Sequence, residues 1–168
     1  LLPEGCEYLA KAVPDGADGV WGVGLRKTTR QPDRFAICPS RILNDSTLTS
    51  CDPSEWDAEW TQEDPDIAPD GKGGMLLVWS ERADYWMETG FEIQGQRYDS
   101  SGEPRWGESG AVVCEEYGDQ TVPRVVADGA EGAVAFWRDS WRGPGYGDLF
   151  AVRIDAEGHS MWGAGGVY

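Results

Sequence analysis

Histidine is almost absent from this chain, and cysteine is scarce. Among 168 residues there are one histidine, His159, and four cysteines, none of them in a CxxC pair. Zinc centres need several such ligands in close spacing, so we do not expect one. The sequence also lacks the GxSxG, Walker, HExxH and strand-linked GxGxxG motifs of common nucleophile, metal and nucleotide sites. These absences predict no catalytic residues and favour a protein that is not an enzyme.

Basic residues are also few. The chain has 14 Lys and Arg against 30 Asp and Glu, which gives a net charge of −16. Binding to nucleic acid or to anionic lipid surfaces needs the opposite sign, so neither is expected. The sequence shows no apolar run long enough to cross a bilayer and no signal-peptide core. We therefore expect a chain that does not span a membrane, and its acidity is compatible with a secreted or periplasmic location.

Helical patterning is missing as well. No segment places its apolar residues at the i, i+3, i+4 and i+7 positions of an amphipathic helix. The chain instead contains 23 glycines and 10 prolines, which bound short apolar runs such as GAVAFWRD at 132–139. Short runs of this kind, rich in β-branched and aromatic residues, are typical of strands. The sequence predicts an all-β protein.

Three stretches of the chain resemble one another. They are AKAVPDGADGVWGVG at 10–24, PDIAPDGKGGMLLVW at 65–79 and PRVVADGAEGAVAFW at 123–137. Their shared Asp-Gly pairs lie 55 and 58 residues apart. An Asp-Gly pair supplies the positive φ angle of a tight hairpin, so each stretch predicts two strands around a turn.

Two further anchors keep nearly the same period. Arg41, Arg97 and Arg153 are each 56 residues apart, and so are Trp106 and Trp162. Three anchors with one period indicate an internal repeat that covers the chain. We predict a single repeat domain at 1–168, with approximate units at 8–52, 63–115 and 121–168.

Each unit is predicted to form four short strands, which is the make-up of a β-propeller blade. The pattern "P…(V/I)…DG…GG…(V/A)W", followed by "R(I/Y)D…G…W", is similar to tandem-repeat β-propeller blades of large, mostly secreted bacterial and archaeal proteins. The best-matched stretch runs from Pro65 to Tyr168, and the first unit departs from the pattern at its edges. The resemblance implies three four-stranded antiparallel blades and an extracytoplasmic setting, but no particular activity.

Three blades are too few for a closed ring, which usually has about four to eight. An open set would expose blade faces and strand edges. We therefore expect a partial propeller or half of a six-bladed ring: the chain pairs with a second copy of itself, docks on another protein, or is a piece of a longer one. A compact packing of three sheets without a channel is the alternative.

The repeated arginines and two of the cysteines have structural interpretations. We expect Arg41, Arg97 and Arg153 to pair with nearby acids such as Asp99 or Asp155, because a residue that recurs in every unit is expected to have a role in every unit.

Cys38 and Cys51 fall on neighbouring predicted strands of the first unit, so they are the favoured disulfide pair. A disulfide would indicate an oxidising compartment. Four unpaired thiols are the alternative.

The acidic loops EDPD at 63–66 and CEEYGD at 114–119 could offer oxygen ligands to calcium, yet neither matches a D-x-D-x-D-G loop. We therefore expect no cofactor, with calcium as the one ion that such loops could bind.

Four segments depart from the repeat: 26–34, 54–62, 80–90 and 138–148. Three of them link the second and third predicted strands of a unit, so they are expected to share one face. Aromatic side chains beside arginines are typical of interface hot spots, and aromatic platforms also stack on sugars. The candidate binding residues are Trp56, Trp60, Arg82, Tyr85, Trp86, Arg138, Trp141, Arg142 and Tyr146. Packing of the tryptophans over the blade rim is the alternative.

These observations predict a non-enzymatic, β-propeller-like binding or scaffolding protein, an extracytoplasmic accessory subunit of a larger assembly. A lectin-like carbohydrate-binding module is the second interpretation, because equivalent sites would also recur once per blade. A fragment of a hydrolase whose catalytic groups lie elsewhere is the third.

Overall fold

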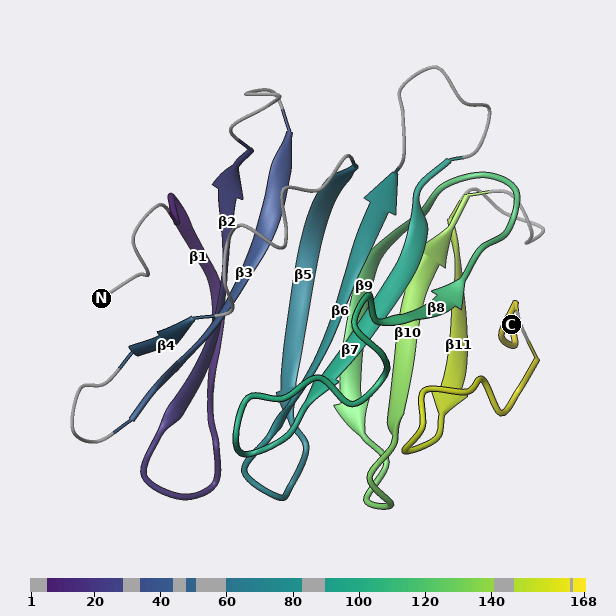
Figure 1. The fold of residues 1–168 in the computed structure, drawn as a ribbon. Coiled ribbons are helices and arrows are strands. Elements are labelled where there is room, and N and C mark those ends of the chain that lie inside the picture. The colour runs from purple at the N-terminus through teal and green to yellow at the C-terminus, as the bar shows by residue number, and fades with distance from the viewer. Residues whose placement is uncertain are drawn as a thin grey trace.

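A computed structural model describes residues 6–28, 34–43, 48–50, 60–82, 90–140, 147–163 and 165–168. The strands form three antiparallel sheets, which we number 1 to 3 in chain order. They stand side by side in a row, with sheet 1 and sheet 3 at its two ends (Figure 1). The predicted all-β class is confirmed. No helix in these ranges is long and apolar enough to cross a membrane.

Within each sheet, every strand pairs with its neighbour in sequence. Sheet 1 has the order β1-β2-β3-β4, with β1 (Tyr8–Pro14), β2 (Val20–Lys27), β3 (Phe35–Ile42) and β4 (Leu48–Ser50). Sheet 2 has the order β5-β6-β7-β8, with β5 (Thr61–Pro69), β6 (Met75–Arg82), β7 (Glu92–Tyr98) and β8 (Ala111–Cys114). Sheet 3 has the order β11-β10-β9, with β9 (Gln120–Ala127), β10 (Ala133–Asp139) and β11 (Asp148–Ile154).

Sheet 3 has three strands, so the predicted fourth strand of the last unit is wrong. In its place Val167 forms an isolated antiparallel bridge with Ala151 of β11, with N···O distances of 2.9 and 2.7 Å. In sheet 2 Ala111 pairs in the same way with Gly95, and β8 then continues as a strand. One bridge is too short to make a strand.

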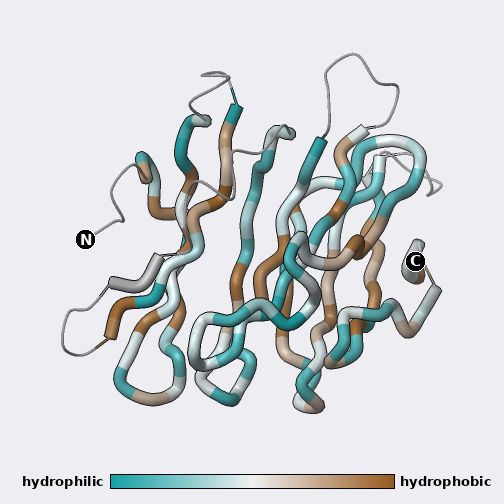
Figure 2. The backbone as a smooth tube through the Cα atoms, in the orientation of Figure 1, coloured by the Kyte–Doolittle hydropathy of each residue, from teal (hydrophilic) through white to brown (hydrophobic). Residues whose placement is uncertain are grey.

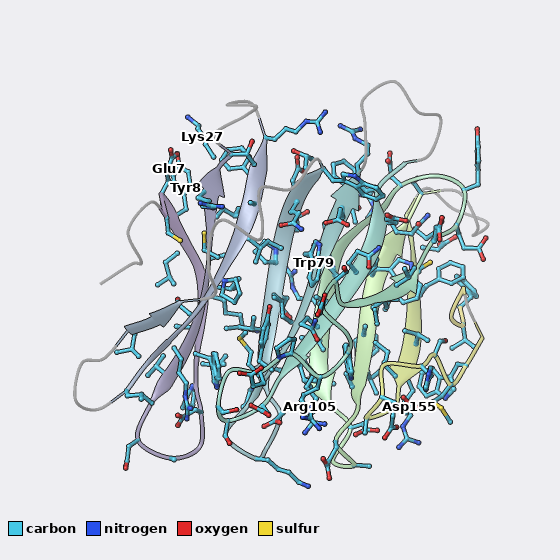
Figure 3. The ribbon with its side chains drawn as sticks, in the orientation of Figure 1. Glu7, Tyr8, Lys27, Trp79, Arg105 and Asp155 are labelled. Atoms are coloured by element: carbon cyan, nitrogen blue, oxygen red, sulfur yellow. The ribbon has the colours of Figure 1, made fainter. Side chains whose placement is uncertain are left out.

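The middle sheet buries both of its faces. The five residues of β6 from Met75 to Trp79 are all buried, and the apolar stretches of the strands lie within the row (Figures 2 and 3). Successive side chains of a strand point to opposite faces. Leu77 and Trp79 therefore pack against sheet 1, while Leu76 and Val78 pack against sheet 3. Burial on both faces explains why this run is apolar at successive positions instead of alternating.

The Asp-Gly turns between the first and second strands share one geometry. In each turn the aspartate Oδ1 accepts hydrogen bonds from the backbone N–H of the second and the fourth residue after it, at 2.7–3.0 Å. The glycine directly after each aspartate has a positive φ of 79–84°. The aspartates are Asp15, Asp70 and Asp128. The predicted role of the Asp-Gly pairs in tight hairpins is confirmed.

The fourth residue after each of these aspartates is also glycine, for a steric reason. A Cβ atom at Gly74 would lie 2.2 Å from the carbonyl oxygen of Tyr98 and 2.6 Å from Oδ2 of Asp70. A Cβ atom at Gly132 would lie 2.2 Å from the carbonyl oxygen of Ile154. The third strand of the sheet therefore approaches this position too closely for any side chain.

Two glycines of the same turn should respond differently to alanine. Gly74→Ala is expected to lower the free energy of unfolding by at least about 3 kcal/mol, the upper range for overpacking, because the methyl group would push β7 away from β6. Gly71→Ala meets open space, so its cost should be about 1 kcal/mol from the left-handed backbone alone. Urea unfolding of both variants measures the difference. Equal losses would contradict this explanation.

Candidate protein interface

The row of sheets ends in a broad apolar face on sheet 3. Strand alternation places one set of side chains of this sheet against sheet 2 and the other set on the opposite side. The second set, which we call the outer face of sheet 3, contains Arg124, Val126, Val134, Phe136, Arg138, Leu149, Ala151 and Arg153. Leu149 is 65% exposed and Val126 is 50% exposed. Large apolar side chains are therefore open to solvent beside three arginines.

The equivalent face of sheet 2 shows what such a surface normally does. By the repeat spacing of 56 to 58 residues, Ala68, Leu76, Val78 and Ile93 stand where sheet 3 has Val126, Val134, Phe136 and Leu149. All four side chains of sheet 2 are buried, because sheet 3 packs on them. The outer face of sheet 3 thus has the chemistry of a face that is buried elsewhere in this molecule.

A pair of equivalent tryptophans shows the same contrast. Trp106 follows β7, donates its indole N–H to the carbonyl oxygen of Ala156 on sheet 3 at 3.1 Å, and is 4% exposed. Trp162 follows β11 at the same place in the last unit and is 43% exposed. The indole ring of Trp106 also lies directly against Gly158 of the next sheet. Trp162 therefore presents an indole to solvent where its counterpart packs on a neighbouring sheet.

Each sheet also contains an ion pair between its Asp-Gly turn and its third strand. Arg41 lies 2.6 Å from Asp15, and Arg153 lies 2.8 Å from Asp128, measured between Nη2 and Oδ2. In sheet 2 the same atoms of Arg97 and Asp70 are 3.2 Å apart. The side chains of these aspartates are buried. Each carboxylate accepts hydrogen bonds from two backbone N–H groups and pairs with one guanidinium.

The expected pairing of the repeated arginines with Asp99 or Asp155 is wrong. Those two aspartates follow the third strands and close hairpins of their own. Asp99 accepts the backbone N–H of Ser101 and Glu103, and Asp155 accepts that of His159. Arg105 and Asp155 mark this edge of sheets 2 and 3 in Figure 3. The arginines project from within the third strand to the turn between the first two strands, which lies 25 to 27 residues earlier in sequence.

Two of these arginines also contact the next sheet in the row. Arg41 donates to the carbonyl oxygen of Ser100 in sheet 2. Arg97 lies 3.3 Å from Oε2 of Glu131 in sheet 3, and Glu131 also pairs with Lys72. The Arg97 side chain is 8% exposed, whereas that of Arg153, at the end of the row, is 43% exposed. Arg153 therefore makes the contact within its own sheet and keeps the other side of its guanidinium in solvent.

In sheets 1 and 3, the ion pair and the turn amides lower the pKa of the turn carboxylate, which is Asp15 in sheet 1 and Asp128 in sheet 3. The Arg41 guanidinium, followed by the Ala17 amide, holds the pKa of Asp15 below its ordinary value of 3.8. Burial acts to raise the pKa of Asp128, but the Ala130 amide and Arg153 outweigh it and the net shift is downward. These carboxylates therefore stay charged at neutral pH and serve as structural anions.

The outer face of sheet 1 forms the other end of the row. This face is flattened, because glycines stand at positions where sheet 2 has large side chains. Leu9, Val20 and Ile42 are exposed on it. A Cβ atom at Gly22 would meet Leu9 and Ser40 at ordinary contact distance, so Gly22 lies on the same face. By the repeat spacing of 55 residues, Gly22 and Gly24 stand where sheet 2 has the buried side chains of Leu77 and Trp79. Glu7, Tyr8 and Lys27 mark the edge of this sheet away from the Asp-Gly turns (Figure 3).

Three of the nine predicted binding residues lie within the described ranges. Trp60 is partly exposed just before β5, and the residue after it, Thr61, pairs with Arg82 at the end of β6. The Arg82 guanidinium lies over the Phe91 ring, 4.4 Å from its centroid. Arg138 is exposed near the end of β10 and belongs to the outer face of sheet 3. Trp56, Tyr85, Trp86, Trp141, Arg142 and Tyr146 lie outside the described residues, and so does Cys51, so the Cys38–Cys51 disulfide stays a prediction.

Three of the four non-repeated segments do connect second and third strands, as predicted. They follow β2, β6 and β10, whose ends lie at the same edge of the row (Figure 1). Trp60 and Arg82 also come together at this edge through the pairing of β5 with β6. The outer face of sheet 3 adjoins the same edge through Arg138.

The acidic stretch at 63–66 lies within β5 and not in a loop, so the expected loop is wrong, and Asp66 has a structural role there. Asp66 pairs with Lys11 of sheet 1 at 2.7 Å and accepts the backbone N–H of Val125 in sheet 3 at 3.0 Å. One carboxylate thus joins all three sheets. Partial desolvation of its carboxyl group, followed by the nearby charge of Asp64, raises the pKa of the neighbouring Glu63. Across the described residues, no three His, Cys, Asp or Glu side chains gather as metal ligands would.

Sequence reasoning missed the apolar members of the outer face of sheet 3. Val126, Phe136 and Leu149 belong to predicted strands, and in a repeat such side chains are expected to be core. Their burial depends on whether another sheet covers this face, and the described residues form no such sheet. Comparison with known proteins returns no matching family model, no matching curated protein and no matching solved structure.

Loss of the repeated arginine should cost more in the middle of the row than at its end. Arg97→Met leaves the Asp70 carboxylate buried without its cation, so we expect a loss of about 3 kcal/mol in unfolding free energy. Arg153→Met should cost about 1 kcal/mol, because water reaches the more exposed end of that pair. Chemical denaturation measures both. A larger loss for Arg153→Met would contradict the comparison.

The depressed pKa values predict acid lability. A carboxylate whose folded-state pKa lies below its unfolded value stabilises the fold above the unfolded pKa, and that contribution disappears as pH falls through the folded pKa. The unfolding midpoint should therefore decrease as the pH falls below 3.8, which is the ordinary pKa of these aspartates. Asp15→Asn retains an acceptor for the turn amides but no charge, so its stability should fall less steeply between about pH 5 and pH 2. Identical slopes for both proteins would contradict this assignment.

Proposed function

We propose that this chain is a non-enzymatic, β-propeller-like binding or scaffolding protein. It acts as an extracytoplasmic accessory subunit and binds another protein through the outer face of sheet 3. The observation that carries this proposal is the contrast between two equivalent faces. Side chains that are fully buried on sheet 2 have exposed counterparts on sheet 3, including Leu149 and Trp162. Contiguous apolar patches rimmed by polar groups mark interaction sites on soluble proteins.

The packing of the first strands supports blade-like sheets. β1 lies beside β5, and β5 lies beside β9, so the first strands of successive sheets follow one another along the row. The innermost strands of propeller blades are arranged in this way. The arginines on the outer face of sheet 3 favour an acidic contact on the partner. His159 pairs with Asp155 on an exposed hairpin, which supports a role in that turn over a role in catalysis.

The lectin-like alternative depends mainly on the aromatic residues outside the described ranges, so it stays a prediction. Nothing in the geometry of Trp60 and Arg82 favours sugar over protein. A glycan array separates the alternatives, because a lectin would bind a defined saccharide without any protein partner.

The proposal is tested with immobilised protein, a native extract and two matched variants. Leu149→Asp places a carboxylate on the outer face of sheet 3, and Val112→Asp makes the same kind of change on β8 of sheet 2, at another exposed apolar residue. Both sites are exposed, so neither change should alter stability by more than about 0.5 kcal/mol. A protein retained by the wild type should be identified by mass spectrometry, purified and rebound.

We expect the purified partner to bind the wild type and Val112→Asp equally. Its affinity for Leu149→Asp should be at least about tenfold weaker, because an unpaired carboxylate would be buried in the contact. Equal binding to all three proteins would contradict the proposed surface. Saccharide binding without a protein partner would favour the lectin instead.

A further inference from the structure

The partner of the outer face of sheet 3 can be specified further, on the basis of the proposed function. We propose that it is a second copy of this chain, which docks head to tail. The outer face of sheet 3 in one copy packs against the outer face of sheet 1 in the other. Arg153 of the first copy then meets Asp18 of the second.

The molecule already contains two contacts of this kind. Sheet 1 packs on sheet 2 and sheet 2 packs on sheet 3, each time through the same two classes of face. The forward face carries the equivalents of Leu76 and Val78, and the backward face carries the equivalents of Met75 and Leu77. After these two contacts, one forward face is left on sheet 3 and one backward face on sheet 1. Contact between them would continue a packing mode that the chain uses twice.

The two remaining faces have complementary relief. On sheet 3, Phe136 replaces the smaller Val78 of sheet 2, and Leu149 is exposed beside it in the neighbouring strand. On sheet 1, Gly22 and Gly24 replace the large Leu77 and Trp79. A raised apolar face therefore corresponds to a flattened one. Close packing needs this kind of match, because a void between the faces would forfeit dispersion contacts.

The charges at the turn edge match as well. Glu131 is the third residue after Asp128, and it receives Arg97 from the preceding sheet at 3.3 Å. The third residue after Asp15 is Asp18, an exposed acid at the equivalent place in sheet 1. Arg153 is the counterpart of Arg97 and is the most exposed of the three repeated arginines. The pair of Arg153 and Asp18 would reproduce, between copies, the contact that Arg97 makes with Glu131 within one chain.

A head-to-tail contact between two copies can be made twice if the pair closes on itself. Each copy then uses both end faces, and the result contains six sheets. This arrangement differs from a dimer in which two sheet 3 faces meet, because disrupting sheet 1 would leave such a dimer intact. The difference makes the proposal testable by complementation.

The experiment measures the absolute mass of the purified chain by light scattering at about 100 μM, where a contact with a Kd of about 1 μM is nearly saturated. The wild type is expected at twice 18.4 kDa. Leu149→Asp disrupts the face on sheet 3, and Val20→Asp disrupts the face on sheet 1, so each variant alone should be monomeric. The control Val112→Asp should remain dimeric. Circular dichroism confirms that each variant retains its strands.

Mixing the two monomeric variants should restore a dimer, because Val20→Asp still has an intact sheet 3 face and Leu149→Asp still has an intact sheet 1 face. Asp18→Lys should weaken dimerisation of the full chain about tenfold, while Glu108→Lys, the same charge change at an exposed acid of sheet 2, should not.

A monomeric wild type would overturn the self-association proposal, and the proposed binding function would still stand if Leu149→Asp lost a different purified protein. A Val20→Asp variant that stays dimeric, or a mixture that stays monomeric, would also overturn the head-to-tail contact.

Discussion

The fold depends most on the buried carboxylate of the Asp-Gly turns. In each sheet one aspartate accepts two backbone N–H groups and pairs with an arginine from the third strand, as Asp70 does with Arg97. The turn, the second strand and the third strand are thereby joined at one point. A sheet of three or four short strands has little core of its own, so this polar anchor adds to the apolar packing in holding the strands together. It also explains the glycines, because the same close approach leaves no room for a side chain at Gly74.

Stability of the row is shared between sheets, as in other repeat architectures where each unit contacts only its neighbours. A neighbouring sheet covers each face of sheet 2. Asp66 of this sheet pairs with Lys11 of sheet 1 and accepts a hydrogen bond from the backbone N–H of Val125 in sheet 3. The first and last sheets each have one face without such a neighbour within the described chain. Within the described residues, the row therefore has one apolar face at each end that no neighbouring sheet covers.

Much of the fold could be predicted from the chain because its signals are local. The 55 to 58 residue spacing of the Asp-Gly pairs, the apolar run of β6 and the positive φ at Gly71 all follow from short-range patterns. The predictions that were wrong depended on contacts between residues far apart in the sequence. Arg97 pairs with an aspartate 27 residues earlier in sequence, although Asp99 is two residues away, because the register of β6 with β7 brings the turn beside it. In sheet 3, Val167 likewise forms only an isolated bridge with Ala151 in place of the expected fourth strand.

The amino-acid sequence by itself determined the all-β class and the hairpin turns, because glycine, aspartate and alternating apolar residues act over a few positions. It also pointed to loop aromatics as binding residues, and most of these lie outside the described ranges. Only the tertiary structure decided which apolar residues are covered. Leu76 and Leu149 are similar side chains on similar strands, yet one is fully buried and the other is 65% exposed. The difference is the presence or absence of a neighbouring sheet, and no local pattern in the chain encodes that.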